Sequence, residues 1–518
     1  MPQPWWRSAV FYQVYVRSFA DSNGDGIGDL PGITSRLDYV RDLGVDAIWL
    51  TPFYPSPQKD HGYDVADYFG VDPAYGTLED FDHLLKRAHQ LRLKVLVDIV
   101  PNHTSDQHKW FKAAVASHKS PMRKRYHFAD PKPGGLPPNN WTSSFGGPAW
   151  SPEPNGPQWY LHLFAPEQPD LNWWHPAVPV EFERILKFWL ERGADGFRID
   201  VAAALFKRKD LADRPLIADR VTGAARFDSA FGIIDQPQLH DVYRRWRQIA
   251  TEYQPDRVLV GEIFDPRRHS RYIVPDQLHM AFALIHLPWD AALWKRSIEV
   301  SRSALRAPGT EPTWTLANHD VVRPVTRLGG GSKGRARAVA ALLLLLGLPG
   351  QVFLYQGEEL GLEEVDLPDS DRQDPVFFHS EGRQKGRDGC RVPLPWSRGQ
   401  PNAGFSDAAP WLPMPPAWDR LAVDVQAASG ESTLGHFRET LAERRRLAGR
   451  LPQVMAWRPA PAGILAYSRG RLTVACNFLD RPTRLPAQGR LLFGSSPLIR
   501  VDGGVLNLPP NSAAWQLA

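Results

Sequence analysis

The sequence predicts an α/β protein built around a (β/α)8 TIM barrel, and two observations lead to this fold class. Eight short apolar runs, each long enough for one buried strand, recur between residues 10 and 355 and alternate with stretches of helical periodicity. Polar and ionisable residues follow nearly all of these runs, and in such barrels the active site lies at the carboxyl ends of the strands. A dinucleotide-binding fold has less support, because no Gly-x-Gly-x-x-Gly turn follows the first run.

The expected strands and helices alternate along the chain. The strands cover residues 10–16, 45–50, 94–100, 197–200, 257–261, 281–287, 313–317 and 351–355. The helices between them include 34–42, 78–90, 180–192 and 239–253, and a helix at 433–447 is expected to close the barrel. The longest apolar block, 336–348, is interrupted by Arg337 and Gly347 and is too short to cross a bilayer, so it is expected to be a core helix.

Two segments interrupt this alternation and one segment follows it. Residues 104–174 are rich in Pro, Gly and Trp and are expected to form an inserted subdomain over the strand ends, after the third strand. Residues 361–418 are a second irregular insertion, after the eighth strand. The last segment, 451–518, consists of short alternating runs with turns, which predicts a C-terminal antiparallel β-sandwich. The barrel then comprises 1–103 and 175–450.

Composition excludes several classes of protein. The net charge is +4 over 518 residues and the charges are interspersed, so no nucleic-acid partner is expected. No apolar run is long enough to span a membrane, and the N-terminus lacks the features of a signal peptide, so we expect a cytoplasmic monomer or homodimer. The only cysteines, Cys390 and Cys476, exclude a disulfide framework and a cysteine-rich zinc site.

Tryptophan is the unusual component, with 19 residues. Several lie in loop-like, proline-rich stretches, where an aromatic face suits stacking against a sugar ring or another flat ligand. These candidates are Trp141, Trp150, Trp159, Trp173 and Trp174.

The fourth expected strand ends in a charged pair, in the sequence Gly196-Phe-Arg-Ile-Asp200. Positions two apart on a strand point the same way, so Arg198 and Asp200 are expected to project together. The guanidinium would lower the pKa of the aspartate, which suits a nucleophile or a stabiliser of positive charge. A structural salt bridge that closes the strand is the alternative.

Four motifs at expected strand ends together resemble a known family. They are Asp98-Ile-Val-Pro-Asn102-His103, residues 196–200, Gly261-Glu262-Ile263 and Asn318-His319-Asp320. In this order they resemble the conserved regions of the α-amylase superfamily of glycoside hydrolases (glycoside hydrolase family 13), with bacterial α-glucosidases and oligo-1,6-glucosidases the most similar branch. Residues 168–172 resemble an additional short motif of that superfamily.

The resemblance implies roles for individual residues. Asp200 would be the nucleophile, Glu262 the general acid/base and Asp320 the stabiliser of the transition state. His103 and His319 would donate hydrogen bonds to sugar hydroxyls, whereas Asn102 is expected to be structural. A retaining glycosidase needs two carboxyl groups about 5–5.5 Å apart, one ionised and one protonated.

The sequence offers a reason for these two ionisation states. Arg198 would keep Asp200 ionised, while the apolar neighbours of Glu262, including Ile263 and Phe264, would favour its protonated form.

Residues 60–64 resemble the superfamily motif that places a tyrosine, here Tyr63, beneath the reacting sugar. In the exo-acting branch an aspartate before this tyrosine, here Asp60, grips the terminal glucose together with an arginine from beyond the eighth strand. Arg387 is the first choice for that arginine and Arg391 the second. Such a pair would close the pocket to longer chains. Surface charge is the alternative role for Asp60 and Arg387.

The loop 21–29 has the oxygen-donor spacing of an EF-hand, although Gly32 stands where the bidentate glutamate would be. The spacing, and a similar loop in oligo-glucosidases, favour a structural Ca2+ or Mg2+ ion, with a metal-free polar turn as the alternative. No organic cofactor is expected. The expected ligands are Asp21, Asn23, Asp25, the carbonyl of Ile27, and Asp29.

The activity expected from these features is retaining, exo-acting hydrolysis of terminal α-linked glucose from maltose-type (α-1,4) oligosaccharides, through a covalent glucosyl-enzyme. An oligo-1,6-glucosidase or a transglucosidase or isomerase acting on sucrose or trehalose is the alternative, and Val201, after the nucleophile, does not decide the linkage. Asp60 disfavours an endo-acting amylase. The presence of all three carboxylates disfavours a transporter subunit without catalysis.

Overall fold

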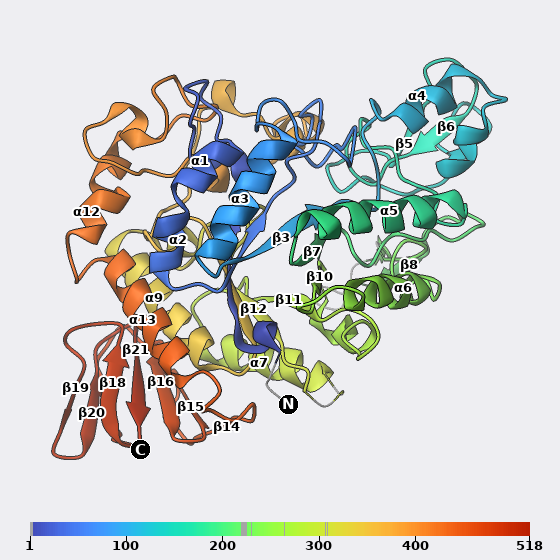
Figure 1. The fold of residues 1–518 in the computed structure, drawn as a ribbon. Helices are drawn as coiled ribbons and strands as arrows, with labels where there is room; N and C mark the ends of the chain where they lie inside the picture. Colours follow the sequence, from blue (N-terminus) through green and yellow to red (C-terminus); the bar gives the residue numbers. More distant parts are fainter. Residues whose placement is uncertain (1–3, 219–224, 229, 264, 306, 308) are drawn as a thin grey trace.

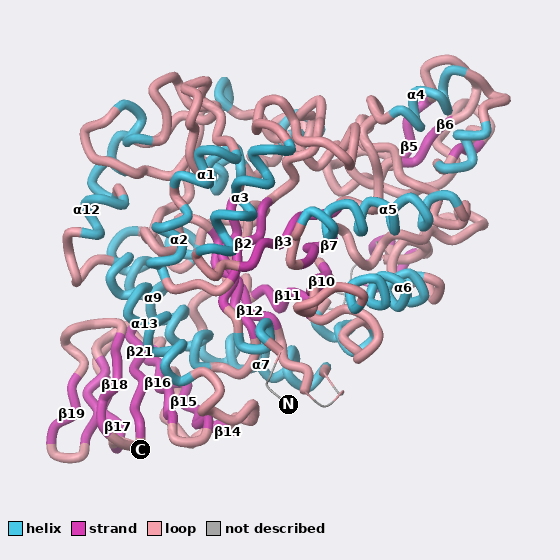
Figure 2. The backbone as a smooth tube through the Cα atoms, viewed as in Figure 1, coloured by secondary structure: helices cyan, strands magenta, loops and turns pink. Residues whose placement is uncertain are grey.

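The computed structural model describes residues 4–218, 225–228, 230–263, 265–305, 307 and 309–518. Its centre is a closed barrel of parallel strands in the order β1-β13-β12-β11-β10-β7-β3-β2, seen in Figure 2 as the magenta strands at the middle of the molecule. The fold class predicted from the sequence is therefore confirmed. The barrel strands are β1 (Val10–Val14), β2 (Ala47–Leu50), β3 (Lys94–Ile99), β7 (Gly196–Ile199), β10 (Val258–Gly261), β11 (Met280–Leu284), β12 (Thr313–Thr315) and β13 (Gln351–Tyr355).

Helices surround the barrel, and their ends follow local signals. A capping box at Thr77 begins α3, and Gly193, with φ +109°, ends α5. The expected helix 34–42 is instead two helices, because Arg36 has a non-helical backbone at the junction of α1 and α2. The surrounding helices are α1 (Leu30–Ser35), α2 (Leu37–Leu43), α3 (Leu78–Gln90), α5 (Ala177–Arg192), α6 (Leu239–Thr251), α7 (Ala291–Ala304), α8 (Pro324–Arg327), α9 (Gly331–Gly347) and α13 (Thr433–Leu447).

The insertion between β3 and α5 extends from the barrel to one end of the molecule (Figure 1). It contains α4 (Lys109–Ala116) and a small antiparallel sheet of β4 (Phe128–Ala129), β6 (Trp159–Leu161) and β5 (Trp150–Pro152). Trp141 and Trp150 are buried in its core and Trp173 in the main core. The prediction that these tryptophans stack on a ligand is therefore wrong for Trp141, Trp150 and Trp173, whose apolar surface is used in packing. Trp159 and Trp174 are only partly buried, and for them it stays a prediction.

A two-stranded element not foreseen from the sequence, β8 (Leu216–Ala218) with β9 (Ala225–Phe227), lies between β7 and α6. The segment before it binds the insertion, because the Trp141 indole donates to the Ala212 carbonyl (3.0 Å). The segment after β13 is mostly irregular and contains α10 (Pro375–His379), α11 (Asp388–Arg391) and α12 (Val423–Ala427).

The C-terminal domain is made of two antiparallel sheets at the other end of the molecule (Figure 1). An apolar cluster that includes Leu506 and Leu508 packs inside it, and the indole of Trp515 donates to the carbonyl of Leu343 on α9 (2.9 Å). No helix in the described part of the chain is long and apolar enough to cross a membrane. The strands are β14 (Ala456–Trp457), β15 (Ile464–Arg469), β16 (Leu472–Asn477), β17 (Thr483–Pro486), β18 (Arg490–Gly494), β19 (Arg500–Asp502), β20 (Val505–Leu508) and β21 (Ser512–Leu517).

Candidate active site

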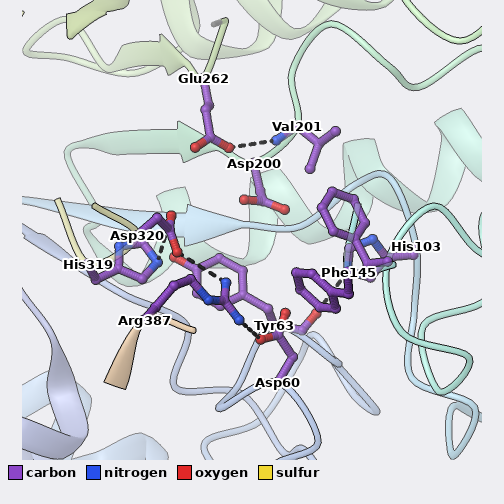
Figure 3. A pocket seen from close by; sticks show the side chains of 11 residues that line it. Asp60, Tyr63, His103, Phe145, Asp200, Val201, Glu262, His319, Asp320 and Arg387 are labelled. Atoms are coloured by element: carbon purple, nitrogen blue, oxygen red, sulfur yellow. Dashed lines mark hydrogen bonds and ion pairs between the residues drawn. The ribbon is translucent and has the colours of Figure 1, made fainter. Parts of the chain in front are cut away.

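A cavity of about 140 Å³ lies at the carboxyl ends of the barrel strands. Figure 3 shows its side chains pointing toward a common centre, with Asp200 between Glu262 on one side and the Asp60–Arg387 pair on the other. The barrel and its two insertions all contribute to the wall. The lining residues are Asp60, Tyr63, His103, Phe145, Phe164, Asp200, Val201, Glu262, His319, Asp320 and Arg387.

Arg198 lies at the centre of a buried group of carboxylates. Its guanidinium is 2.7 Å from Asp200 and 2.8 Å from Glu262, and it also contacts Asp98 at 3.1 Å. The strand register explains this convergence, because Arg198 on β7 pairs with Asp98 on β3 and with Val260 on β10. Among the described residues, Arg198 is the one cationic side chain within ion-pair distance of Asp200 or Glu262.

Asp98, Asp200 and Glu262 share one guanidinium, so one of these three carboxyl groups is favoured to keep its proton. Burial raises the pKa of Asp98 to about 7. Burial also raises the pKa of Asp200 well above its ordinary value; the nearby Glu262 and Asp98 carboxylates add to this shift, and Arg198 opposes it. The expectation that Arg198 keeps the pKa of Asp200 low is therefore wrong, because burial, with Glu262 and Asp98 adding to it, outweighs the effect of the guanidinium. Phe264, expected to surround Glu262, lies outside the described residues.

Val201 directly follows Asp200 and has φ +46°, a left-handed conformation that is strained for a β-branched residue. In this conformation its backbone N–H donates to the second carboxylate oxygen of Glu262 (3.2 Å). The turn after β7 therefore positions the side chain that follows β10.

Asp320 is held in a cationic environment. Its carboxylate contacts Arg387 (3.1 Å) and Arg391 (2.9 Å), and it is 3.5 Å from the imidazole of His319. Burial acts to raise the pKa of Asp320, but His319, Arg387 and Arg391 outweigh it and hold that pKa well below its usual range. Asp320 therefore remains ionised under conditions in which Asp200 and Asp98 can each hold a proton.

Arg387 closes one end of the cavity. It forms an ion pair with Asp60 (2.7 Å) and is itself held by Asp374 (2.8 Å), and its guanidinium lies 5.0 Å from the ring centre of Phe145. Arg391, the second choice for the partner of Asp60, contacts Asp320 instead. The amide of Gln168 donates to the other oxygen of Asp60 (3.1 Å).

Stacked rings form a second wall. Tyr63 and His319 are nearly parallel, with ring centres 5.2 Å apart, and the Tyr63 hydroxyl donates to Asp98 (3.0 Å). Gln13 donates to Nδ1 of His319 (2.6 Å), which leaves Nε2 as the donor on the side of Asp320. Burial lowers the pKa of His319 well below its ordinary value and that of His103 to about 4, so both rings are neutral at neutral pH.

Asn102 lies outside the cavity, in a buried cluster of polar groups around the Lys207 side chain. The ammonium group of Lys207 contacts Asn102 (2.6 Å), Asp170 (2.7 Å) and the carbonyl of Ala204 (2.9 Å). Lys207 follows β7 and Asp170 belongs to the insertion, so this cation joins the insertion to the barrel.

The loop 21–29 lies between β1 and α1, away from the cavity. The Asp21 carboxylate accepts from the N–H groups of Gly24 and Gly26, both at 2.8 Å, and the side-chain oxygens of Asn23 and Asp25 each accept from the N–H two residues on. These turns coil the loop. Oδ1 of Asp21 accepts from two N–H groups, whereas the side-chain oxygens of Asn23 and Asp25 each accept one hydrogen bond and keep a lone pair that suits a hard cation. The described residues nevertheless contain no cluster of three His, Cys, Asp or Glu side chains close enough to hold a metal, and Asp29 is used to cap α1.

The barrel and its polar cavity together define an enzyme with a carboxylate-based active site. Residues 13–449 match the family model of the α-amylase catalytic domain, and the chain belongs to this family of glycoside hydrolases.

Three relatives illustrate the similarity. A probable α-glucosidase from Rhizobium meliloti is 43% identical over 85% of this chain and 82% of its own length. An oligo-1,6-glucosidase from Heyndrickxia coagulans is 36% identical over 85% of each chain. The crystal structure of the α-glucosyl transfer enzyme XgtA has 39% identity and a TM-score of 0.91, and the alignment covers 99% of this chain and 100% of that one.

Several residues of the site were not foreseen from the sequence. Phe145 and Phe164 come from the inserted subdomain and line the cavity, and Asp374 orients Arg387. Phe145 and Phe164 carry no local signal because their segment lacks a regular period. Gln168 belongs to the motif at 168–172. Its amide donates a hydrogen bond to Asp60, and through this contact the motif helps to position a residue of the cavity wall.

Proposed function

We propose that the protein is a retaining, exo-acting α-glucosidase that releases terminal glucose from maltose-type (α-1,4) oligosaccharides. The observation that carries the proposal is the Asp60–Arg387 ion pair across the cavity from Asp200 and Glu262. A charged pair at the closed end can grip the hydroxyls of one terminal sugar and leaves no room for a chain to continue.

In the first step Asp200 attacks the anomeric carbon and forms a covalent ester, while Glu262 donates its proton to the leaving oxygen. The cluster of Asp98, Asp200 and Glu262 favours one retained proton; the step requires that proton on Glu262 and leaves Asp200 ionised beside Arg198. Asp320, which remains ionised, holds sugar hydroxyls, and the Tyr63 ring lies where it can stabilise positive charge on the sugar.

In the second step Glu262, now a carboxylate, removes a proton from water, and the water oxygen attacks the anomeric carbon. The ester bond to Asp200 breaks, and the product keeps the α configuration. The N–H of Val201 holds Glu262 in place through both steps.

A transglucosidase is the second candidate, in which a sugar hydroxyl replaces water in the second step. The name of XgtA, an α-glucosyl transfer enzyme at 39% identity, favours this alternative. Hydrolysis of α-1,6 linkages is favoured by the name of the Heyndrickxia relative.

Product analysis on maltose, isomaltose, sucrose and trehalose in parallel tests the proposal. Maltose should be cleaved fastest, with free glucose as the main product. Faster cleavage of isomaltose, or isomeric disaccharides as the main products, would contradict the assignment in favour of the alternatives.

We also propose that the loop 21–29 binds a structural Ca2+ or Mg2+ ion. Asp21, Asn23, Asp25, the Ile27 carbonyl and Asp29 would hold it. The ion would stabilise the connection between β1 and α1 and would take no part in catalysis.

A further inference from the structure

A small cavity with a volume of about 20 Å³ lies between the barrel and the C-terminal domain. Arg444 on α13 and Arg469 at the end of β15 line it from the two sides, and we call it the arginine cavity. Ala448 and Gly449 on its rim are exposed and leave a route from solvent. The rest of the lining is mainly apolar and includes Leu346, Leu472 and Trp515.

The arginine cavity is remote from the active site. Arg444 donates to the carbonyls of Ser8 (3.2 Å) and Gly350 (2.6 Å), which come just before β1 and β13. The arginine cavity is therefore at the amino ends of the barrel strands, whereas the active-site cavity is at their carboxyl ends. A ligand bound here acts on the fold, and the inference does not depend on the proposed function.

Both guanidinium groups are buried among neutral partners. Each of the two arginines is 7% exposed. Arg444 donates to three backbone carbonyls, and Arg469 donates to two backbone carbonyls and to the side-chain oxygen of Gln453. Among the residues that the structure describes, no carboxylate is within ion-pair distance of either guanidinium group.

The charged groups nearby do not supply the missing counter-charge. Asp46 and Glu311 act on the two arginines from beyond ion-pair distance. Each of these carboxylates already has another arginine as its partner, at 3.5 Å and 3.4 Å respectively. The carboxyl end of α9, where Leu346 accepts from Arg444, offers about half a negative charge. Since both guanidinium groups are always protonated, more than one buried positive charge is left without a partner.

The guanidinium groups also keep N–H donors for a ligand. Each has five N–H groups, and each makes three hydrogen bonds. The buried Nε–H of Arg444 has no partner, although buried donors are ordinarily paired. One anion held between Arg444 and Arg469 would satisfy the free donors and compensate the buried charge.

The size of the cavity restricts the class of anion. A water molecule needs about 10–15 Å³, so the arginine cavity has room for one ion of similar size and excludes phosphate and sulfate. A halide ion accepts N–H groups from any direction, and it loses less hydration beside apolar side chains than a small, strongly hydrated anion does. These properties favour chloride.

We propose that the arginine cavity binds one chloride ion between Arg444 and Arg469. The ion reduces the repulsion between the two guanidinium groups and thereby holds the C-terminal domain to the barrel. Because the unfolded chain has no such site, chloride binding stabilises the folded protein and makes its Tm depend on chloride concentration.

The test follows thermal unfolding of the full-length enzyme as sodium chloride replaces sodium gluconate, whose anion is too large for the cavity, at a constant ionic strength of about 0.2 M. Relative to Arg469→Met, which lacks one of the two cations, chloride should raise the Tm of the wild type by about 1–2 °C, with saturation. Arg471→Met is the matched control, because Arg471 is exposed on the turn that follows β15, and it should respond to chloride as the wild type does. An equal response in the wild type and in folded Arg469→Met would overturn the proposal.

Leu451→Trp provides a second variant if Arg469→Met does not fold. Leu451 is partly buried in the lining, so the larger indole should fill the cavity and remove the chloride response while both arginines remain. A full response in this variant would contradict the site. The position of the ion is tested with crystals soaked in sodium bromide. An anomalous difference peak should lie within hydrogen-bond distance of nitrogen atoms of both Arg444 and Arg469, and the absence of this peak would also overturn the proposal.

Discussion

Replacement of Asp60 by alanine tests the closed end of the glucose pocket. One oxygen of Asp60 is 2.7 Å from Arg387 and the other accepts from Gln168 at 3.1 Å, so the carboxylate is fixed and 4% exposed. Hydrogen bonds to a charged group contribute about 1.5–3 kcal/mol. Loss of one such bond to the sugar should lower kcat/KM by about 10- to 150-fold. Arg387 keeps Asp374 as a partner, so the fold should survive.

The assay is steady-state hydrolysis of maltose and of an aryl α-glucoside, with Tm measured for each variant. Asp67→Ala is the matched control, because Asp67 follows in the same loop but is exposed, and its kcat/KM should remain within about twofold of wild type. A loss below about threefold for Asp60→Ala, with Tm unchanged, would refute the reasoning that this carboxylate holds the sugar.

Three further predictions concern charge. Asp200→Asn should lower turnover at least about a thousandfold and raise the free energy of unfolding at neutral pH by about 1 kcal/mol. Because the pKa of Asp200 is raised in the folded protein, the stability that its protonated form contributes is lost as pH rises through that pKa. The gain in the variant, measured by thermal unfolding, should therefore disappear toward acid pH, and a gain that is constant with pH would contradict this. Lys207→Met leaves Asp170 buried without its cation and should destabilise the fold by about 3–5 kcal/mol. The same change at the exposed Lys109 should not. Equal Tm values for the two variants would contradict a stabilising Lys207–Asp170 ion pair. A chelator should lower the Tm of the wild type but not of Asp21→Ala, and an unaltered wild-type Tm would count against a structural cation.

The barrel could be predicted because its signals are local. Each strand is a short apolar run, and each catalytic candidate comes directly after one, so the register of parallel strands brings Asp200 and Glu262 together. The break between α1 and α2 at Arg36 could not be predicted, since the apolar period continues across it.

The ionisation of the site could not be predicted from sequence neighbours. Arg198 is two residues from Asp200, but Asp98 and Glu262 reach the same guanidinium from strands distant in the chain. Phe145 was missed for a similar reason, because the fold of the irregular insertion brings its ring next to Arg387. Trp141 and Trp150 were assigned to ligand stacking for the opposite reason: an aromatic residue in an irregular segment can still belong to a core.

The configuration of the first product tests the central claim most directly. Proton NMR during hydrolysis of an aryl α-glucoside, before mutarotation, should show α-glucose, because attack by Asp200 and then by water inverts the anomeric carbon twice. Initial β-glucose would mean a single inversion and would contradict a covalent intermediate on Asp200.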